Sequence, residues 1–257
     1  MGIMLQRTLP AGFIAPCLLT KTDKLPSGSQ WLHEIKHDGF RIIARKSDGR
    51  VRLYSRPGND FTRRFPLIVE ALTSLRSRSC IIDGEAVACD GNGIASFDLI
   101  RNHRANDSVF LYAFDLIELN GDDVRRDPLQ VRKATLASIL AKACPGIRFN
   151  EHIEGDGPTV FAHACKMGLE GIVSKRKDST YRSGRSPGRG LGPVTSLLLK
   201  RASASRPSGE WNDEDYDVLS DGVVKTRPPT EAASVTNRKF FDCGRRKALP
   251  TPALTKL

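Results

Sequence analysis

Short hydrophobic runs separated by Asp-Gly or Asn-Gly pairs are the feature that most limits the fold of residues 31–119. The runs are rich in β-branched and aromatic residues, as in FRIIARK, VRLYSR and VFLYAFDLIEL. The pairs are Asp38-Gly39, Asp48-Gly49, Asp83-Gly84, Asp90-Gly91 and Asn120-Gly121. Such pairs accept positive φ at little cost, so they are strong short-range signs of a β-hairpin. The pattern predicts antiparallel sheet, with Lys36 beside a hairpin turn at Asp38-Gly39.

Three segments carry a helical rather than a strand pattern. One lies near FPLIVEALTSL, and a second is predicted from about Asp127 to Ala143, with Asp127 as N-cap and Pro128 at the first helical position. A third is predicted from Pro158 to Met167, where Gly168 follows as a terminating residue. The apolar stripe of the second segment consists of Leu129, Leu136, Ile139 and Leu140. We therefore expect an α+β fold in which antiparallel sheets are flanked by helices.

The charge balance favours a polyanionic partner. The 257 residues contain 40 Lys and Arg against 29 Asp and Glu, which gives a formal net charge of +11. Nucleic acid is the leading partner on this ground, ahead of an acidic membrane surface. A hydrophobic content of 39% is enough for an ordinary buried core.

Cysteine spacing and the early apolar run indicate the compartment. The six cysteines form no CxxC pair, so we expect reduced, mostly buried thiols in a cytosolic protein. The run AGFIAPCLL is short and is broken by Pro16. It predicts neither a membrane-spanning helix nor a signal peptide, and we expect cytoplasmic residence without membrane association.

The character of the sequence changes near Pro187. Residues 1–187 hold the periodic segments, whereas residues 188–257 have no sustained periodicity and alternate between acidic and basic stretches. We expect one folded domain over 1–187 and a weakly structured tail over 188–257.

Several motifs within the first domain resemble, in order and spacing, those of the ATP-dependent DNA ligases. They are EIKHDGFR (34–41), SRPG (55–58), DGEAV (83–87), YAFDLIELNG (112–121) and EGIVSK (170–175). The resemblance is closest to bacterial ligases of end joining and spans roughly residues 10 to 187. It implies an ATP-grasp-like nucleotidyltransferase domain that uses ATP with Mg²⁺ or Mn²⁺. It also implies a nucleoid-associated monomer whose partners are nicked or broken double-stranded DNA and end-joining proteins.

In that family the motif lysine attacks the α-phosphate of ATP and becomes a lysyl-AMP; the AMP then passes to a DNA 5′-phosphate, and a 3′-hydroxyl displaces it. The resemblance assigns the nucleophile to Lys36. Only a neutral amine attacks, and desolvation or nearby cations favour that form. Asp38 in contact with Lys36 would favour the ammonium, so we expect Asp38 to serve the turn or a hydrogen bond. Gly39 either lets backbone approach the nucleotide or serves the turn alone.

The resemblance assigns further residues to the nucleotide. Glu34 should recognise the adenine edge, Arg41 the sugar or phosphate region, and Arg56 the ribose side. Phe114 matches the aromatic residue that stacks on the base, although the alternation in YAFDL would also bury it in the sheet. Lys175 matches a basic residue that points at a phosphate.

Two carboxylates are the expected metal ligands. Glu85 and Glu170 match the acidic residues of the third and fourth motifs. Converging carboxylates can hold Mg²⁺ directly or through water, and the ion then offsets phosphate charge.

The sequence departs from the family after SGRSP. A fifth motif, WxKxK, is expected there, but GRGLGPVTSLLLKRASASRP stands in its place, and no run of short strands predicts the family's oligonucleotide-binding barrel. A changed reading frame near codon 187 is one hypothesis for this abrupt replacement. The departure leaves three functions open: a DNA ligase with impaired activity, an RNA ligase or capping-type nucleotidyltransferase, and a catalytically degenerate nucleic-acid-binding module.

Overall fold

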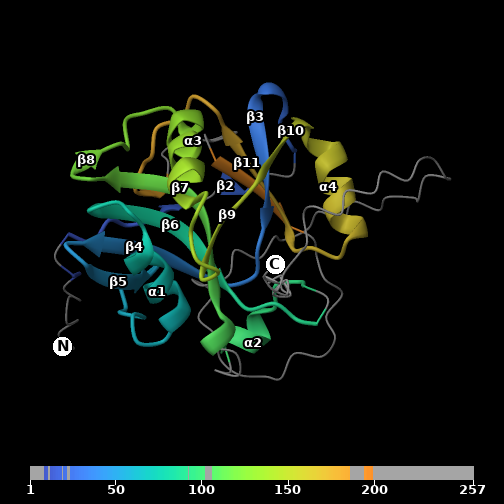
Figure 1. Cartoon of the computed structure of the whole chain (residues 1–257). Helices are drawn as coiled ribbons and strands as arrows, with labels where there is room; N and C mark the ends of the chain where they lie inside the picture. The colour runs from blue at the N-terminus through green and yellow to red at the C-terminus, as the bar shows by residue number, and fades with distance from the viewer. Residues whose placement is uncertain are drawn as a thin grey trace, which may run out of the picture.

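Two sheets of different size dominate the computed structural model (Figure 1). The structure describes residues 9–10, 12–18, 20–21, 24–91, 93–101, 106–185 and 194–198. The larger sheet has the strand order β5-β4-β6-β7-β8, and β9 pairs with β7 on a side path. Its members are β4 (Phe40–Ser47), β5 (Arg50–Ser55), β6 (Ser79–Val87), β7 (Phe110–Leu119), β8 (Asp122–Asp123) and β9 (Ile147–Phe149). All of these pairings are antiparallel except β7 with β9, as the turn pattern predicts.

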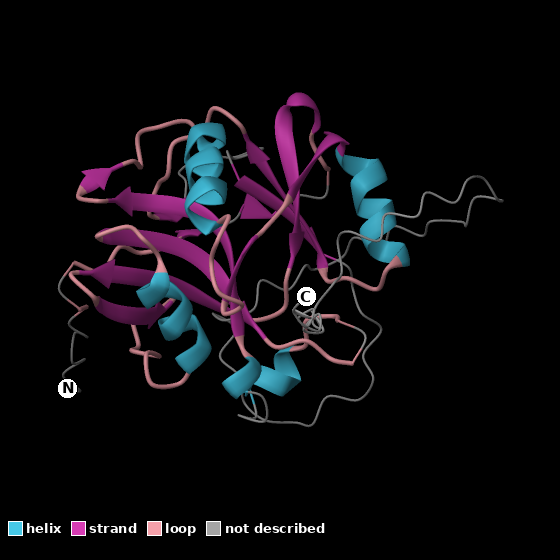
Figure 2. Cartoon of the chain, viewed as in Figure 1, coloured by secondary structure: helices cyan, strands magenta, loops and turns pink. Residues whose placement is uncertain are grey.

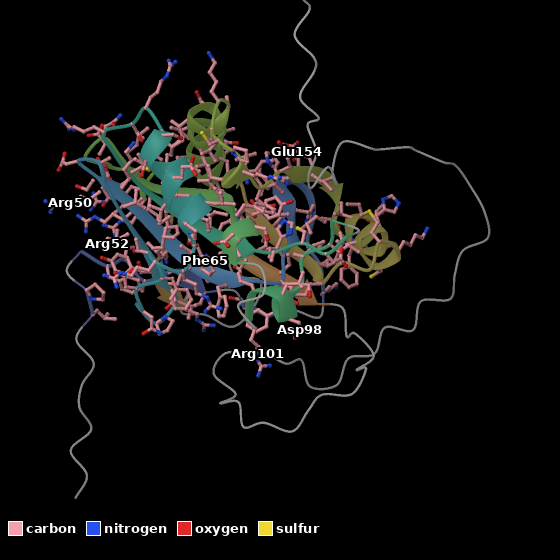
Figure 3. The ribbon with its side chains drawn as sticks, turned by 60° about the horizontal axis from the view of Figure 1, so that its bottom comes forward. Arg50, Arg52, Phe65, Asp98, Arg101 and Glu154 are labelled. Carbon is pink, nitrogen blue, oxygen red and sulfur yellow. The ribbon has the colours of Figure 1, made fainter. Side chains whose placement is uncertain are left out.

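The smaller sheet has the order β10-β3-β11-β13-β2. Its members are β2 (Thr20–Lys21), β3 (Ser27–Lys36), β10 (His152–Asp156), β11 (Gly171–Arg176) and β13 (Val194–Leu198). A separate parallel pair joins β1 (Cys17–Leu18) to β12 (Gly184–Arg185). Figure 3 shows Arg50 and Arg52 pointing outward from edge strand β5, on the opposite side of the molecule from Glu154 on edge strand β10.

The helices flank the sheets, as expected for an α+β fold (Figure 2). They are α1 (Pro66–Ser74), α2 (Phe97–Arg101), α3 (Leu129–Leu140) and α4 (Gly157–Lys166), with a 3₁₀ turn at Asn106–Ser108. Helices α1 and α3 contact the larger sheet, and α4 contacts β3, β10 and β11. The main core therefore lies between the larger sheet and α1 with α3, and includes Ile42, Leu53, Phe65, Leu72, Ile82, Leu111 and Leu136.

The helix boundaries differ from the predictions by a few residues. The predicted N-cap at Asp127 is wrong, because Pro128 occupies the cap without a side-chain hydrogen bond. Helix α4 begins one residue before the predicted Pro158, because the Asp156 carboxylate caps it by accepting a hydrogen bond from Thr159 N. Gly168 follows with a φ of 69°, the left-handed conformation expected of a terminating glycine.

The predicted hairpin at Asp38-Gly39 is also wrong. Strands β3 and β4 flank this pair but belong to different sheets: β3 pairs with β10 and β11, and β4 pairs with β5 and β6. Neither residue has positive φ, in contrast to Asp48-Gly49 and Asn120-Gly121, which do join paired strands. Lys36 therefore ends a strand at the point where the chain passes from one sheet to the other.

Gly39 is needed for a reason other than the two proposed from sequence. A Cβ at this position would lie 2.2 Å from the main-chain oxygen of Ala86 on β6. The absence of a side chain lets the crossing segment press against the larger sheet. A substitution here would push the end of β3 away from that sheet.

The cysteines correct one further expectation, and five residues of the expected tail are described. Among described residues the five cysteines at 17, 80, 89, 144 and 165 are free thiols, but only Cys80 is buried and the others are half-buried. Strand β13 lies within the segment expected to be weakly structured, and it extends the smaller sheet beside β11. Apart from 194–198, that expectation concerns residues outside the described ones and stays a prediction. No helix in the described part of the chain is long and apolar enough to cross a membrane.

Candidate functional site

A pocket that is open to solvent lies between the two sheets. Strand alternation brings its charged residues together, because side chains two residues apart share one face of a strand. Glu34 and Lys36 thus share a face of β3, and Arg41 stands directly opposite Glu85 across β4 and β6. The predicted site residues in the lining are Glu34, Lys36, Arg41, Glu85, Phe114 and Lys175. These six side chains come from five strands and from four of the five sequence motifs.

Arg41 is fixed by a carboxylate that sequence reasoning did not assign. Asp83, fully buried on β6, accepts bonds of 2.6 and 2.8 Å from the Arg41 guanidinium and one of 2.7 Å from the Tyr181 hydroxyl. Burial alone would lower the pKa of Arg41, but the Asp83 carboxylate more than offsets it and raises that pKa. Arg41 therefore remains a cation whose orientation in the pocket is set by a bidentate pair.

Tyr181 ties the segment after β11 to the rest of the site. Its hydroxyl donates to Asp83 and accepts a 3.1 Å hydrogen bond from Cys17 N, the first residue of β1. Burial raises the pKa of this phenol, and the neighbouring Asp83 carboxylate adds to the effect. Tyr181 thus stays a neutral donor that links β1, β6 and the segment after β11.

Glu34 lines the pocket and is 2% exposed. Its carboxylate accepts a 2.6 Å bond from Lys133 Nζ on α3 and a 2.7 Å bond from Lys175 Nζ on β11. The Asn150 side-chain amide adds a contact of 3.4 Å. Burial would raise the pKa of Glu34, but the two ammonium groups lower it below the usual range. Glu34 is therefore an anion that can only accept hydrogen bonds.

Lys36 forms an ion pair with Glu170, which precedes β11. Gly171 stands opposite Lys36 in the register of β3 and β11, so the pairing of the two strands sets this contact. The two side chains are 26% and 23% exposed, which leaves the pair accessible to water. The contact fixes the position of the Lys36 amino group at the end of β3.

Glu85 is a carboxyl group whose surroundings favour the protonated form. Burial raises its pKa to about 7, Glu170 and Asp83 add to the rise, and the cations of Arg41 and Lys36 oppose it. A cation bound beside Glu85 would stabilise its ionised form. Mg²⁺ needs only one or two protein carboxylates when substrate phosphates and water complete its shell. Glu85 and Glu170 fit that donor set, although no cluster of three or more His, Cys, Asp or Glu able to hold a metal occurs among the described residues.

Phe114 is buried in the sheet, as the alternation of YAFDL predicts, and its stacking on a base stays a prediction. It is 9% exposed and also lines the pocket. The Arg41 guanidinium carbon and the Lys175 Nζ each lie 4.4 Å from its ring centroid. The ring is thus a buried platform that attracts cations and offers an aromatic surface to a ligand.

His37 follows Lys36 but is held as a neutral ring. It stacks on Tyr112 with ring centroids 3.8 Å apart, and a ring nitrogen bonds Asn150 Oδ1 at 3.1 Å. Burial lowers its pKa to about 4. His37 therefore lines the pocket without carrying charge near neutral pH.

Two residues of the predicted motifs lie elsewhere. Arg56 is exposed in the turn that follows β5 and does not line the pocket, so its contact with a ribose stays a prediction. Asp38 accepts a 3.3 Å hydrogen bond from Phe97 N, which agrees with the structural role expected of it.

Sequence reasoning missed Lys133 and Arg132, which it placed in a packing helix. Both side chains are 2% exposed and share the buried face of α3 with Leu129 and Leu136. Arg132 forms a bidentate pair with Asp115, a carboxylate that the sequence left unassigned. Two basic residues on an apolar helix face were the available signal, because buried cations need partners.

Known proteins resemble the part of the chain that builds this pocket. A family model described as ATP dependent DNA ligase domain matches residues 18–191. The multifunctional non-homologous end joining protein LigD of Pseudomonas aeruginosa is 36% identical over 178 residues, which cover 68% of this chain and 21% of that protein. The chain thus matches about a fifth of the length of such relatives.

Two solved structures also match. The ligase domain of M. tuberculosis LigD has a TM-score of 0.62 at 32% identity, over 71% of this chain and 58% of that one. A mycobacterial DNA ligase D complexed with ATP and MES has a TM-score of 0.62 at 33% identity, over 71% of this chain and 59% of that one. The fold is therefore that of a ligase nucleotidyltransferase domain.

Proposed function

The chain belongs to the family of ATP-dependent DNA ligase domains, and from this premise we propose that it seals DNA breaks through a covalent lysyl-AMP on Lys36. The observation that carries the proposal is convergence. Six residues that are dispersed along the sequence meet in one pocket: Glu34, Lys36, Arg41, Glu85, Phe114 and Lys175. The match is to DNA ligases, so an RNA ligase or a capping enzyme is not favoured.

In the first step Lys36 would act on ATP. Lys36 leaves Glu170, loses its proton to water, and its Nζ attacks the α-phosphorus. A phosphorus–nitrogen bond forms, the bond from the α-phosphorus to the bridging oxygen breaks, and pyrophosphate departs. The protein contributes mainly positioning and charge neutralisation to such a transfer. Arg41, oriented by Asp83, and Lys175, once it turns from Glu34, supply two positive charges for that purpose.

The carboxylates would hold the metal ion. Glu85 and Glu170 are the residues that we assign to Mg²⁺, and the ion would offset negative charge on the phosphates. Glu85 must be ionised to serve, and its raised pKa of about 7 predicts weaker metal binding below neutral pH. Glu34 and Phe114 would hold the base.

The later steps concern DNA. The AMP would pass from Lys36 to a 5′-phosphate, after which a 3′-hydroxyl attacks that phosphate, forms the phosphodiester and releases AMP. A formal net charge of +11 supports a polyanionic partner. The fifth motif is absent from the sequence, so we propose that adenylation is slowed and that nick sealing is impaired more strongly. We also propose that the chain acts as a monomer on nicked or broken double-stranded DNA, with end-joining proteins as partners.

Intact-mass measurement tests the proposal. The full chain with ATP and Mg²⁺ should gain the mass of one AMP, and Lys36→Ala should gain none. GTP in place of ATP should give no adduct. A wild-type chain that stays unmodified while a control ligase is labelled would contradict the first step. Labelled protein that fails to transfer AMP to nicked DNA would instead place the defect after adenylation.

A further inference from the structure

The Glu34 carboxylate has two lysine partners that differ in what surrounds them. Lys175 lines the pocket, and its Nζ lies over the Phe114 ring that also lines it. Lys133 is not among the lining residues, although Leu129 and Arg132 of the same helix are, and it reaches Glu34 from α3. A ligand can therefore draw Lys175 away from Glu34, whereas Lys133 has no access to the ligand.

Three neighbouring groups hold the Lys133 ammonium in place. It donates a 2.6 Å bond to Glu34 Oε1 and a 3.0 Å bond to the main-chain oxygen of Asn150. Its Nζ also lies 4.4 Å from the centroid of the Phe149 ring. The side chain is 2% exposed, so an ammonium here persists only because these partners replace water.

A fixed cation paired with Glu34 has a consequence for the hydrogen bonds that Glu34 can make. An ionised carboxylate only accepts hydrogen bonds, whereas a protonated one also donates. If Lys175 turns toward a phosphate, Lys133 is the remaining ammonium that keeps Glu34 ionised. The carboxylate then accepts from an amino group and repels a carbonyl oxygen placed at the same point.

We propose that Lys133 is a positioning residue for nucleobase selection, because it holds Glu34 as an acceptor-only anion that selects a purine with an amino group at C6. The inference rests on the proposed nucleotide-binding function of the pocket. It adds a residue outside the ligand contacts that decides between adenine and a 6-oxopurine.

The test compares ATP with inosine triphosphate, whose purine carries a carbonyl at C6 and a proton on N1. Equilibrium binding of each is measured by calorimetry without divalent cation, so that binding is separated from adenylation. The wild-type chain should prefer ATP by at least about 100-fold, because the Glu34 carboxylate accepts from the C6 amino group of adenine and repels the C6 carbonyl oxygen of the inosine base. In Lys133→Met the preference should fall about 10-fold, since a hydrogen bond to a charged acceptor is about twice as strong as a neutral one.

Matched variants separate selection from folding. Lys133→Gln keeps a hydrogen-bond donor without the charge and should also lose preference for ATP. This variant replaces Lys133→Met in the test if the methionine variant folds poorly. Lys133→Arg keeps the charge and should restore most of the preference. Lys46→Met is the control, because Lys46 is also buried, donates to the main-chain oxygens of Thr73 and Leu75, and does not line the pocket. It should leave the ATP preference unchanged.

The outcomes distinguish the inference from the function on which it rests. A folded Lys133→Met or Lys133→Gln variant with the wild-type preference overturns the role of Lys133 and leaves the ligase function standing. A wild-type chain that binds neither nucleotide overturns both. An equal loss of ATP preference in Lys46→Met would show that losing any buried lysine has this effect through general destabilisation, and it would also overturn the inference.

Discussion

The two ends of the pocket hold their ion pairs in different surroundings. At the end proposed to hold the base (the base end), the paired side chains of Glu34 and Lys133 are each 2% exposed. At the reaction end, Lys36 and Glu170 are 26% and 23% exposed and share one ion pair. A buried network resists change because each charge needs its partners, whereas a partly hydrated pair exchanges partners at low cost. Under the proposed function, the base end would recognise the nucleotide and the reaction end would change partners during the chemistry.

The largest expected effect separates binding from chemistry at the reaction end. Lys36→Arg keeps a positive charge beside Glu170 but removes the nucleophile, because a guanidinium does not lose its proton at accessible pH. The rate of AMP-adduct formation should fall more than about 10⁴-fold, as when other enzymes lose their nucleophile. Intact mass measures the adduct, and calorimetry should find ATP affinity changed less than about 10-fold. An adduct of normal yield in this variant would move the nucleophile elsewhere.

A second prediction contrasts the two ends in stability. Glu34→Gln leaves two buried ammonium groups without an anion and should lower the free energy of unfolding by about 3 kcal/mol or more. Glu170→Gln breaks the partly exposed pair and should lower it by at most about 1 kcal/mol. Urea titration measures both values. Similar losses in the two variants would remove the distinction between a fixed and an exchangeable end.

The order of the same two variants should reverse in single-turnover adenylation. Glu170→Gln removes a proposed metal ligand and should slow the chemical step by about 100-fold, whereas Glu34→Gln should act mainly on ATP affinity. Rate and affinity are separated by varying ATP concentration. A Glu170→Gln variant with the wild-type rate would contradict its assignment.

A third prediction concerns pH and Glu85. Its folded pKa of about 7 lies above the usual value of 4.5, so the folded chain binds this proton more tightly than the unfolded chain does. Unfolding free energy should therefore fall as pH rises from about 4.5 to about 7. Glu85→Gln removes this dependence. Without metal, the free energy of unfolding of the variant should rise relative to wild type by about 1–2 kcal/mol as pH increases from 5 to 8. Thermal unfolding at several pH values measures it, and parallel curves for the two proteins would refute the raised pKa.

The smallest expected effect is that of His37. Its folded pKa of about 4 lies below the usual 6.5, so the unfolded chain binds the proton more tightly and wild-type stability should fall as pH drops from about 6.5 to about 4. The loss of unfolding free energy caused by His37→Gln should be about 1 kcal/mol smaller at pH 5 than at pH 7.5. Adenylation rate above pH 7 should change less than about 10-fold, since the ring is neutral there. A rate that follows the titration of a group near 6.5 and loses that dependence in His37→Gln would make His37 a proton carrier.

Some of the site was predictable from local sequence because strand periodicity is local. The spacing in EIK places Glu34 and Lys36 on one face of β3. The alternation of FRIIARK places Arg41 and Ile42 on opposite faces of β4. The helices and most strands follow from the same periodicities. The predictions of site and fold agree with the structure where interactions between neighbours along the chain determine the local conformation.

The remainder depends on partners that are distant in sequence. Asp38-Gly39 carries the same turn signal as Asp48-Gly49, but β3 finds its partners in β10 and β11, more than a hundred residues onward, so no hairpin forms. Lys133 meets Glu34 across 99 residues of sequence, and no helical pattern specifies that contact. The Asp83 pair with Arg41 likewise depends on the register of β4 and β6. Tertiary pairing overrides local signals at these positions.

Locating the AMP within the chain tests the central claim most directly. The full protein is incubated with ATP and Mg²⁺, digested, and its peptides are sequenced by mass spectrometry under conditions that preserve a phosphoramidate. The account predicts one AMP, on the peptide that contains EIKHDGFR and on Lys36 within it. AMP on Lys133, Lys175 or any other residue, or no AMP under conditions that label a control ligase, would contradict it.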